Sequence, residues 1–540
     1  MGLPAANLRP VSPLTRPPEQ TPSARDGSPE PFASANGKIL PVHRLAEVVA
    51  AARDRGRKVV HCHGVFDLLH IGHIRYFEQA RRMGDLLVVT VTPDRYVDKG
   101  SHRPAFPELL RAEAVASLGC VDFAAINEWP TAEETLRLLR PHVYVKGSEF
   151  RNIGSDMTGK IAAEAEVVSE IGAELRFTED IVFSSSNLIN RYLSNLPEEL
   201  NEYLDLFRKR WSLDQVLETI DRMESLRVLV VGDTILDEYQ YCDAMGKSSK
   251  DPVLALRYRS HDLFAGGVLA VANHVSNFAG RVDLVTAIGE VDSHEGFIRS
   301  KLNANVEPRL FVQPGAPTTV KRRFLDGYSF NKLFEVYVMD DSGLPRAADS
   351  RACQELEDRA GKYDLVIAAD FGHGAVSPEM VRVLAREAPY LAVNAQANAG
   401  NRGFHTVTRY PRADYACLAE HEIRLETRDL RSSIRPMMDR VAKKLSCPLF
   451  VVTRGRSGCL IRGGERKFVA VPAFAHKTID RVGAGDAFFS VTALAAAQRV
   501  PCEVLGFIGN VAGALAVEIL GNQKAIDKLS VKKSVTSLMK

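Results

Sequence analysis

The sequence HGVFDLLHIGHIRYFEQAR, residues 63–81, decides the fold of the first part of the chain. It follows the apolar run KVVHC at residues 58–62, which predicts a buried strand. From His70 and His73 onward, apolar residues recur every three to four positions, which is typical of a helix. A buried strand that leads directly into a helix is the opening unit of a parallel α/β sheet.

The same residues predict a phosphate site. In such sheets, ligands bind beyond the carboxyl ends of the strands. A helix that begins near Ile71 offers backbone N–H groups and a partial positive charge to an anion. His70 and His73 can lie on one side of that helix and donate N–H groups to a triphosphate, while Gly72 leaves room for its approach. Without further context, two histidines at a helix start are more often ordinary polar residues.

Composition divides the chain into two α/β units with connecting segments. Residues 1–36 are rich in Pro, Ser and Ala and predict a disordered tail. Short apolar runs alternate with helical segments over residues 38–195, which predicts a parallel sheet covered by helices. A polar, helix-prone linker at 196–225 leads to a second α/β alternation at 226–525. The basic segment 526–540 is expected to be a frayed tail.

The length, net charge and cysteine content of the chain limit the classes of function that it can have. A chain of 540 residues exceeds a single core of about 250–300 residues, which predicts more than one domain. A formal net charge of +2 does not indicate nucleic acid or a membrane as a partner. The eight cysteines are scattered without a Cys-x-x-Cys pair, which indicates neither a zinc cluster nor a disulfide framework and favours the cytoplasm. A small-molecule substrate is therefore expected.

A second motif, DRVGAGDAFFS at residues 480–490, predicts a phosphoryl-transfer site. The small residues Gly483, Ala484 and Gly485 form a turn whose backbone N–H groups can hold a transferring phosphoryl group. Asp486 lies in the first turn of the apolar helix that follows and can accept a proton from a sugar hydroxyl. The alternative is an ordinary helix start with an acidic residue near its positive end.

The first unit resembles a known family. GVFDLLHIGHIRYFEQARRMGDLLVVTVTPD is similar to the opening of the cytidylyltransferase-like nucleotidyltransferases, whose hallmark is His-x-Gly-His after a Gly-x-Phe-Asp turn. DKGSHRPAFPELLRAEAVASLGCVD, PHVYVKGSEF and FSSSNLINRYL extend the resemblance. It implies a Rossmann-like sheet with His70, His73 and Lys99 as catalytic residues. It also implies nucleotide or phosphate contacts at Gly64, Phe66, Gly72, Arg111, Lys146, Ser184, Ser185 and Ser186, although Lys146 also fits a solvated surface charge.

The second unit resembles the ribokinase-like (PfkB) carbohydrate kinases. The resemblance rests on the 480–490 motif and on VLVVGDTILDEY, FAGGVLAVANHVSNFAG, PTTVKRRFL and VVTRGRSGCLI. It implies an α/β sandwich with a small β lid, and Asp486 as a catalytic residue. Phosphate or nucleotide contacts are implied for Gly455, Gly483, Ala484 and Gly485, and sugar contacts for Asp237, Gly266, Gly267, Lys321 and Arg323.

Together the two halves look like bacterial bifunctional heptose kinase/adenylyltransferases with the domain order reversed. This resemblance implies phosphorylation of a sugar, such as heptose 7-phosphate, at its anomeric hydroxyl. Nucleotidyl transfer to the sugar 1-phosphate would then give an ADP-sugar and pyrophosphate. ATP and Mg²⁺ are implied, CTP is the other candidate nucleotide, and a homodimer or higher homo-oligomer is compatible with the lid strands.

Several positions depart from the kinase pattern. Glu335 stands where the resemblance implies an arginine, which would repel a sugar phosphate. An alternative is therefore an active nucleotidyltransferase fused to a noncatalytic or re-specialised sugar-binding domain; a purely structural protein would have little reason to keep both motifs. The other departures are Ala270, Asn394, Gln396, Ala419, Arg481 and Tyr337, and Glu422 alone is retained from a motif that helps organise magnesium indirectly.

Overall fold

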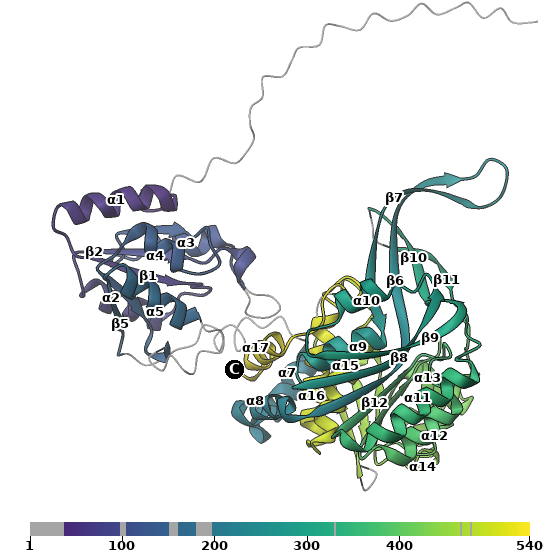
Figure 1. Ribbon diagram of the computed structural model, residues 1–540. Helices are drawn as coiled ribbons and strands as arrows, with labels where there is room; N and C mark the ends of the chain where they lie inside the picture. Colours follow the sequence, from purple (N-terminus) through teal and green to yellow (C-terminus); the bar gives the residue numbers. More distant parts are fainter. Residues whose placement is uncertain are drawn as a thin grey trace, which may run out of the picture. The chain divides into compact units, whose positions relative to one another are not determined.

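The computed structural model describes residues 37–97, 104–150, 160–179, 197–328, 331–464, 467–475 and 478–540. The described residues form two compact units. Unit 1 holds most of those between 37 and 179, and unit 2 holds those from 197 onward. The predicted α/β architecture with two domains is confirmed, and Figure 1 shows strands and helices alternating in each unit.

Unit 1 contains a five-stranded parallel sheet in the order β3-β2-β1-β4-β5. The central strands are buried along their length because helices cover both faces, so they read as continuous apolar runs. The strands are β1 (Val59–Gly64), β2 (Leu86–Val91), β3 (Phe123–Ile126), β4 (Val143–Lys146) and β5 (Glu174–Phe177). The helices are α1 (Val42–Asp54), α2 (Ile71–Arg81), α3 (Glu108–Ala116), α4 (Glu133–Leu139) and α5 (Lys160–Glu170).

Unit 2 is built on one long strand that belongs to two sheets. Residues 227–233 of β6 (Arg227–Lys247) pair with β8 and β12 in the main sheet. From residue 234 onward, β6 pairs with β7 and β10 in a second sheet that β11 completes, and this is the predicted lid (Figure 1). The remaining strands are β7 (Leu254–Gly267), β8 (Arg281–Val291), β9 (Val306–Pro317), β10 (Val320–Asp326), β11 (Lys332–Val338), β12 (Leu365–Asp370), β13 (Leu391–Ala395), β14 (Tyr415–Ala419), β15 (Leu449–Thr453), β16 (Cys459–Arg462) and β17 (Phe468–Val471).

Helices cover both faces of the main sheet of unit 2. One apolar core lies under α9, α15 and α16, and a second lies under α11, α12, α13 and α14, which form the green layer in Figure 1. The helices are α7 (Glu198–Arg210), α8 (Leu213–Arg222), α9 (Val268–Ser276), α10 (Glu295–Lys301), α11 (Arg346–Arg359), α12 (Pro378–Glu387), α13 (Glu420–Thr427), α14 (Ile434–Lys444), α15 (Ala484–Ala497), α16 (Cys502–Ala516) and α17 (Lys528–Met539). The lid therefore joins a three-layered body at the point where β6 passes from one sheet to the other.

The C-terminal segment differs from the frayed tail expected from its composition. Residues 528–539 form α17, and Val531 and Val535 on one face of this helix are fully buried in the core of unit 2. Lys532 Nζ also lies 2.9 Å from Asp221 Oδ2 of α8. Two apolar residues four positions apart are enough to dock a basic helix, because its lysines remain at the surface.

The segment expected to be a helical linker is helical and is also part of a core. It forms α7 and α8, and Leu204, Phe207 and Ile220 are buried in unit 2. The Phe207 ring stacks on Phe507 of α16 with a centroid distance of 4.3 Å. These helices therefore contribute to the stability of unit 2.

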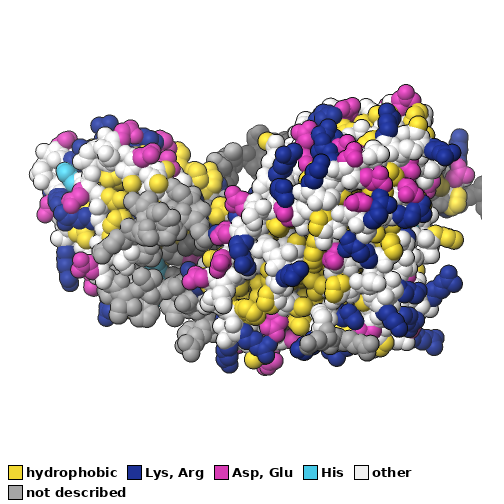
Figure 2. Space-filling model, turned by 60° about the horizontal axis from the view of Figure 1, so that its bottom comes forward, with side chains coloured by type: hydrophobic (Ala, Val, Ile, Leu, Met, Phe, Trp, Pro, Cys, Tyr) yellow, Lys and Arg dark blue, Asp and Glu magenta, His cyan; other side chains and the backbone are white. Residues whose placement is uncertain are grey.

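The described surface mixes charges of both signs. In the view of Figure 2, Lys and Arg side chains alternate with Asp and Glu over the visible face of unit 2, in keeping with the net charge of +2. Among the described residues, no helix combines the length and apolarity needed to cross a bilayer.

Candidate active sites of the two units

Two imidazole rings lie together at the start of α2 in unit 1. His70 is the N-cap of this helix, and its Nδ1 accepts a hydrogen bond of 3.1 Å from the Gly72 N–H. The rings of His70 and His73 lie 4.1 Å apart between centroids at an interplanar angle of 35°. Burial lowers the pKa of His70, so its ring is neutral at pH 7 and carries its proton on Nε2. The structure thus gathers two imidazoles and a helix N-terminus beyond the end of β1.

Phe66 holds this pair from the side of the core. Its backbone has a φ of 48°, and its ring lies 5.7 Å from the His73 ring in an edge-on arrangement and 4.9 Å from Phe77. A Cβ on Gly64 would lie 2.9 Å from Phe66 Cζ, so the ring requires a glycine there. Both residues were predicted to contact the nucleotide, and in the structure Gly64 lies against the Phe66 ring, which packs on His73.

Arg111, which was predicted to contact phosphate, is held by acceptors within the protein. Its side chain is completely buried and donates hydrogen bonds to the carbonyl oxygens of Val65 and Thr92 and to Asp94 Oδ1, the last at 2.6 Å. All three acceptors belong to the loops that follow β1 and β2. A buried guanidinium needs such partners, so Arg111 fixes the two loops that border the site.

Lys146 forms a buried ion pair. It ends β4, and its Nζ lies 2.7 Å from Glu164 Oε2 of α5, with both residues more than nine-tenths buried. The Tyr144 hydroxyl donates to the same carboxylate at 3.0 Å. The solvated surface charge considered for Lys146 is therefore wrong, because this side chain is buried in an ion pair.

A chain of hydrogen bonds that the sequence reasoning missed runs from the core to the site. His61 Nε2 and His63 Nδ1 both lie 2.8 Å from Thr90 Oγ1, and His63 Nε2 lies 3.2 Å from Thr92 Oγ1. Burial, aided by the charge of Lys146, lowers the pKa of His61 to about 3, so this histidine is neutral. The signal was available in KVVHCHG, because alternate residues of a strand share a face.

Lys99, Ser184, Ser185 and Ser186, which were predicted to act in unit 1, lie outside the described residues.

In unit 2, Asp486 lies at the start of α15. Gly483, with a φ of 80°, is the N-cap of this helix, and the first turn of a helix presents backbone N–H groups to an anion. Gln396 Nε2 donates to Asp486 Oδ1 at 2.6 Å. Burial raises the pKa of Asp486 to about 6, and the hydrogen bond from Gln396 acts in the opposite direction. A carboxylate with this pKa is suited to accept a proton near neutral pH.

Asn522, which sequence reasoning also missed, joins the turn before α15 to the predicted sugar site. Its Nδ2 donates to Asp237 Oδ2 at 3.0 Å. A Cβ on Gly483 would lie 2.4 Å from Asn522 Oδ1, and a Cβ on Gly266 would lie 2.2 Å from Asp237 Oδ2. Two of the predicted glycines are therefore required by close approach. The signal in the sequence is weak, because Asn522 stands alone in a turn far from either motif.

The predicted sugar-binding residues of the lid lie on one face. Lys321 pairs in register with Asp237, and Arg323 pairs with Tyr239. Arg323 Nη1 donates to Asp237 Oδ1, and its Nε donates to Glu335 Oε1 at 3.0 Å. Burial lowers the pKa of Lys321, which is 7% exposed. The structure therefore brings Asp237, Lys321 and Arg323 together.

A third carboxylate connects the lid to the turn before α15. Asp480 accepts hydrogen bonds from the Tyr239 hydroxyl and from Lys332 Nζ of β11, each at 2.7 Å, and from the Gly521 N–H at 3.0 Å. These bonds, with that of Val482 N–H, hold the pKa of Asp480 below its usual range despite burial. Asp480 therefore positions the turn that precedes Asp486.

The carboxylate of Glu422 is held by the start of its own helix and by the segment that follows β13. It accepts hydrogen bonds from the N–H groups of Ala419 at 2.6 Å and Ala397 at 3.1 Å. Burial raises the pKa of Glu422 to about 7. Among the described residues, no group of three or more His, Cys, Asp or Glu is arranged to hold a metal ion. Glu422 was predicted to organise magnesium only indirectly, and both of its carboxylate oxygens already accept backbone hydrogen bonds.

The remaining predicted positions fall at turns and helix starts. Gly267, with a φ of 55°, begins α9, where Ala270 is buried. Gly455, also with a φ of 55°, begins a single 3₁₀ turn after β15. Arg481 is exposed, and Asn394 Nδ2 donates to the Cys417 carbonyl at 2.7 Å.

Replacing Gly266 with alanine is expected to impair sugar binding. The added Cβ would overlap Asp237 Oδ2 and displace the carboxylate from Asn522. We expect KM for the sugar to rise by about tenfold or more, equivalent to about 1.4 kcal/mol. Steady-state kinetics of phosphorylation measure this, and Gly296→Ala, at a site with open space around the Cβ, is the matched control. An unchanged KM in Gly266→Ala would contradict this position for the sugar.

Comparison with protein families finds two matches along the chain. Residues 225–529, which are more than half of the chain, match the pfkB family carbohydrate kinases. Residues 61–191 match the cytidylyltransferase-like family.

Curated relatives include proteins named bifunctional protein HldE. That of Trichlorobacter lovleyi is 32% identical over 170 residues, covering 31% of this chain and 33% of the relative. That of Geotalea uraniireducens is 38% identical over 140 residues, covering 25% of this chain and 29% of the relative. The chain thus spans about a third of the length of the curated relatives it matches.

Two solved structures are similar to this chain over 58% of its length. A putative ribokinase from Agrobacterium tumefaciens is 18% identical with a TM-score of 0.46, over 58% of this chain and 98% of that chain. Phosphofructokinase-2 from Escherichia coli in complex with substrates and products is 15% identical with a TM-score of 0.49, over 58% of this chain and 100% of that chain. The family match over residues 225–529 shows that the chain belongs to the pfkB family of carbohydrate kinases, and the match over residues 61–191 shows that a cytidylyltransferase-like domain precedes this kinase domain.

Proposed function

We propose that the protein makes a nucleotide sugar in two steps on one chain. Unit 2 phosphorylates a sugar at its anomeric hydroxyl, and unit 1 transfers a nucleotidyl group to the resulting sugar 1-phosphate. The proposal rests above all on one observation: each matched domain has a polar site at a helix start, His70 and His73 in unit 1 and Asp486 in unit 2. The product of the second site is a nucleophile for the first.

In unit 1, the sugar phosphate attacks the α-phosphorus of a nucleoside triphosphate and pyrophosphate leaves. A phosphate oxygen is already a nucleophile at pH 7, so a general base is not needed. His70 and His73 donate N–H groups to the phosphate oxygens, and the N-terminus of α2 adds its partial charge. The resemblance to adenylyltransferases favours ATP over CTP.

In unit 2, Asp486 removes the proton from the anomeric hydroxyl as its oxygen attacks the γ-phosphorus of ATP. ADP leaves, and the N–H groups of the turn at Gly483 and Gly485 stabilise the charge on the transferred group. Asp237 and Asn522 hold the sugar hydroxyls. The resemblance to heptose kinases makes a heptose and its 7-phosphate the first acceptors to test.

Magnesium, the partners and the location follow from the same proposal. Mg²⁺ would be bound together with the triphosphate and would neutralise part of its negative charge, and the protein would supply few of its ligands. The partners are a nucleoside triphosphate and a sugar or sugar phosphate, and the strands of the lid offer a surface for a homo-oligomer. We place the protein in the cytoplasm, where these metabolites occur.

Mass spectrometry of the purified full chain tests the two steps directly. The chain is incubated with Mg²⁺ and either ATP or CTP. A heptose, its 7-phosphate or its 1-phosphate is added in separate reactions. The expected products are a heptose 1-phosphate from the heptose, a heptose 1,7-bisphosphate from the 7-phosphate, and a nucleotide sugar with pyrophosphate from the 1-phosphate. No nucleotide sugar with either triphosphate would overturn the role of unit 1.

The phosphorylation rate is expected to rise with pH through about 6. Asp486 must be unprotonated to act as a base, and burial raises its pKa to about 6, so the active fraction is low at pH 5 and nearly complete at pH 7.5. Profiles of kcat/KM against pH for the sugar measure this. A profile with no acidic limb between pH 5 and 7 would contradict the assignment of Asp486 as the base.

One observation favours a second candidate, in which unit 2 binds a sugar without phosphorylating it. Gln396 donates to Asp486, and Glu422 is held by Ala397 and Ala419, so both carboxylates are engaged within the protein. This candidate predicts sugar binding and nucleotidyl transfer without consumption of ATP by unit 2.

A further inference from the structure

The lid presents six side chains to the predicted sugar site, and their register defines a common face. On β10, Lys321 lies between Asp237 of β6 and Tyr337 of β11, while Arg323 lies between Tyr239 and Glu335. Cross-strand partners share a face, and residues two apart on a strand share it too. We call this set, Asp237, Tyr239, Lys321, Arg323, Glu335 and Tyr337, the inner lid face.

The charges of the inner lid face are already paired within the protein. The Arg323 guanidinium donates to both Asp237 and Glu335, and its side chain is only 9% exposed. The Tyr337 hydroxyl donates to Glu335 Oε2 at 2.8 Å. The Arg323 guanidinium, the strongest candidate for bidentate binding of a phosphate, is therefore engaged by two carboxylates.

Even with Lys321 included, the inner lid face has no net positive charge. The inner lid face contains two cations, Lys321 and Arg323, and two carboxylates, Asp237 and Glu335, so its formal charge is zero. Asp486 lies close enough for the charges of Asp237 and Lys321 to affect its pKa, and it adds a further negative charge when ionised. Four of the six side chains, those on β6 and β10, are buried, while Glu335 is exposed. A phosphate ester placed here would bring up to two more negative charges into a partly buried, neutral to negative site, which is unfavourable.

We propose that unit 2 accepts a sugar that carries no phosphate against the lid, and that Glu335 sets this preference. The inference rests on the proposed function. Of the two acceptors named there, a heptose and its 7-phosphate, it selects the heptose. Glu335 acts through Arg323: by pairing with the guanidinium, it withholds from a phosphate the cation that would otherwise bind it. The sugar hydroxyls then bind Asp237 and Asn522, and phosphorylation gives a sugar 1-phosphate that unit 1 uses directly.

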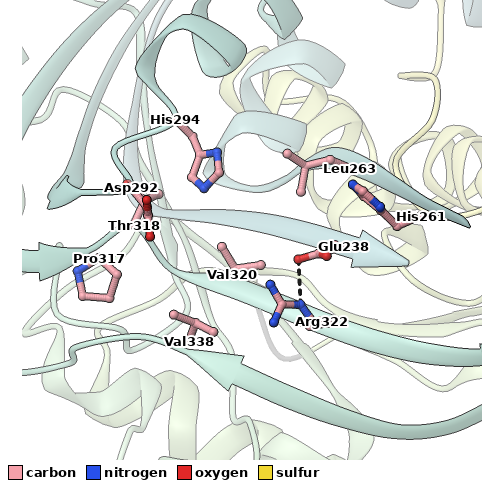
Figure 3. A pocket seen from close by; sticks show the side chains of 10 residues that line it. All are labelled: Glu238, His261, Leu263, Asp292, His294, Pro317, Thr318, Val320, Arg322 and Val338. Carbon is pink, nitrogen blue, oxygen red and sulfur yellow. Dashed lines mark hydrogen bonds and ion pairs between the residues drawn. The ribbon is translucent and has the colours of Figure 1, made fainter. Parts of the chain in front are cut away.

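The opposite face of the lid provides a matched control. Figure 3 shows the pocket on that side, a cavity of about 260 Å³ in which Arg322 lies against Glu238. Arg322 Nε donates to Glu238 Oε2 at 2.8 Å. Glu238 follows Asp237 in β6 and therefore points away from the inner lid face. Glu238→Gln removes the same charge as Glu335→Gln at nearly the same position in the fold, on the wrong side for the sugar.

Phosphorylation kinetics of the full chain with a heptose and with its 7-phosphate test the proposal. The wild-type chain is expected to prefer the unphosphorylated sugar in kcat/KM. Glu335→Gln keeps an acceptor for Arg323 but removes the charge, and is expected to lower KM for the phosphorylated sugar by about tenfold with little change in kcat. Glu238→Gln is expected to leave the preference unchanged. If Glu335 had only a structural role, Glu335→Gln would change KM and kcat by the same factor for both sugars.

Calorimetric binding of both sugars to Asp486→Asn separates this inference from the proposed function. One outcome is that the wild type phosphorylates neither sugar and yet binds the unphosphorylated one more tightly. In that case unit 2 is not a kinase for these sugars, but its preference for the unphosphorylated sugar stands. Tighter binding or faster turnover of the 7-phosphate in the wild type overturns the preference. Equal shifts in Glu335→Gln and Glu238→Gln overturn the role of Glu335, and binding of neither sugar overturns both proposals.

Discussion

Replacing His73 with alanine is expected to lower nucleotidyl transfer by about 10²–10³-fold while sugar phosphorylation continues at the wild-type rate. The ring of His73 lies beside that of His70 at the start of α2. In the proposed function, negative charge develops there as pyrophosphate leaves. Loss of one preorganised donor raises the barrier without removing the binding site. Release of pyrophosphate from ATP and a sugar 1-phosphate measures the effect.

His43→Ala is the matched control for this variant. His43 lies on α1 of the same unit, is exposed and contacts Glu128, away from α2. Thermal unfolding of both variants verifies that unit 1 is intact. If His73→Ala retains more than about a tenth of the wild-type rate, His73 is not a main donor to the triphosphate.

Replacing Asp486 with asparagine is expected to lower phosphorylation by about 10²–10⁴-fold and to leave nucleotidyl transfer from supplied sugar 1-phosphate intact. Asparagine has nearly the same shape and can still bond to Gln396, but it cannot take the proton of the sugar hydroxyl. The acidic limb of the pH profile should disappear with the activity. ADP formation in the presence of the sugar measures the change.

Asp358→Asn, an exposed change of the same kind on α11, controls for the loss of one charge in unit 2. Sugar binding by calorimetry verifies that Asp486→Asn still forms its site. If phosphorylation survives Asp486→Asn unchanged, unit 2 uses another base. If the wild type binds the sugar but never consumes ATP, the second candidate, a sugar-binding domain fused to a nucleotidyltransferase, is correct.

Some of the candidate site could be predicted from the sequence because it depends on local spacing. His70 and His73 are three residues apart, so once α2 forms they lie side by side whatever the rest of the chain does. Asp486 similarly follows a turn of small residues and must lie at the start of α15. The apolar runs of β1 and β2 predicted a parallel sheet because only strands covered on both faces are apolar throughout.

Other residues depend on partners far away in the chain. The sequence predicts that Lys146 and Arg111 contact phosphate, but it cannot show that the fold places Glu164 and Asp94 beside them in ion pairs. The prediction of a frayed C-terminal end was wrong because it too depended on partners far away in the chain. Two valines in twelve residues are too few to predict packing, but α8 and α16 provide a surface for them.

The sequence by itself therefore determined the two α/β units, the order of the domains and the helix starts at which His70, His73 and Asp486 lie. Only the tertiary structure decided the net charge of the proposed sugar site. That charge depends on Asp237, Arg323 and Glu335, which come from three different strands and meet because β6 passes from the main sheet into the lid. Charges separated by nearly a hundred residues have no pattern in the sequence, since their interaction depends on distance and burial in the folded chain.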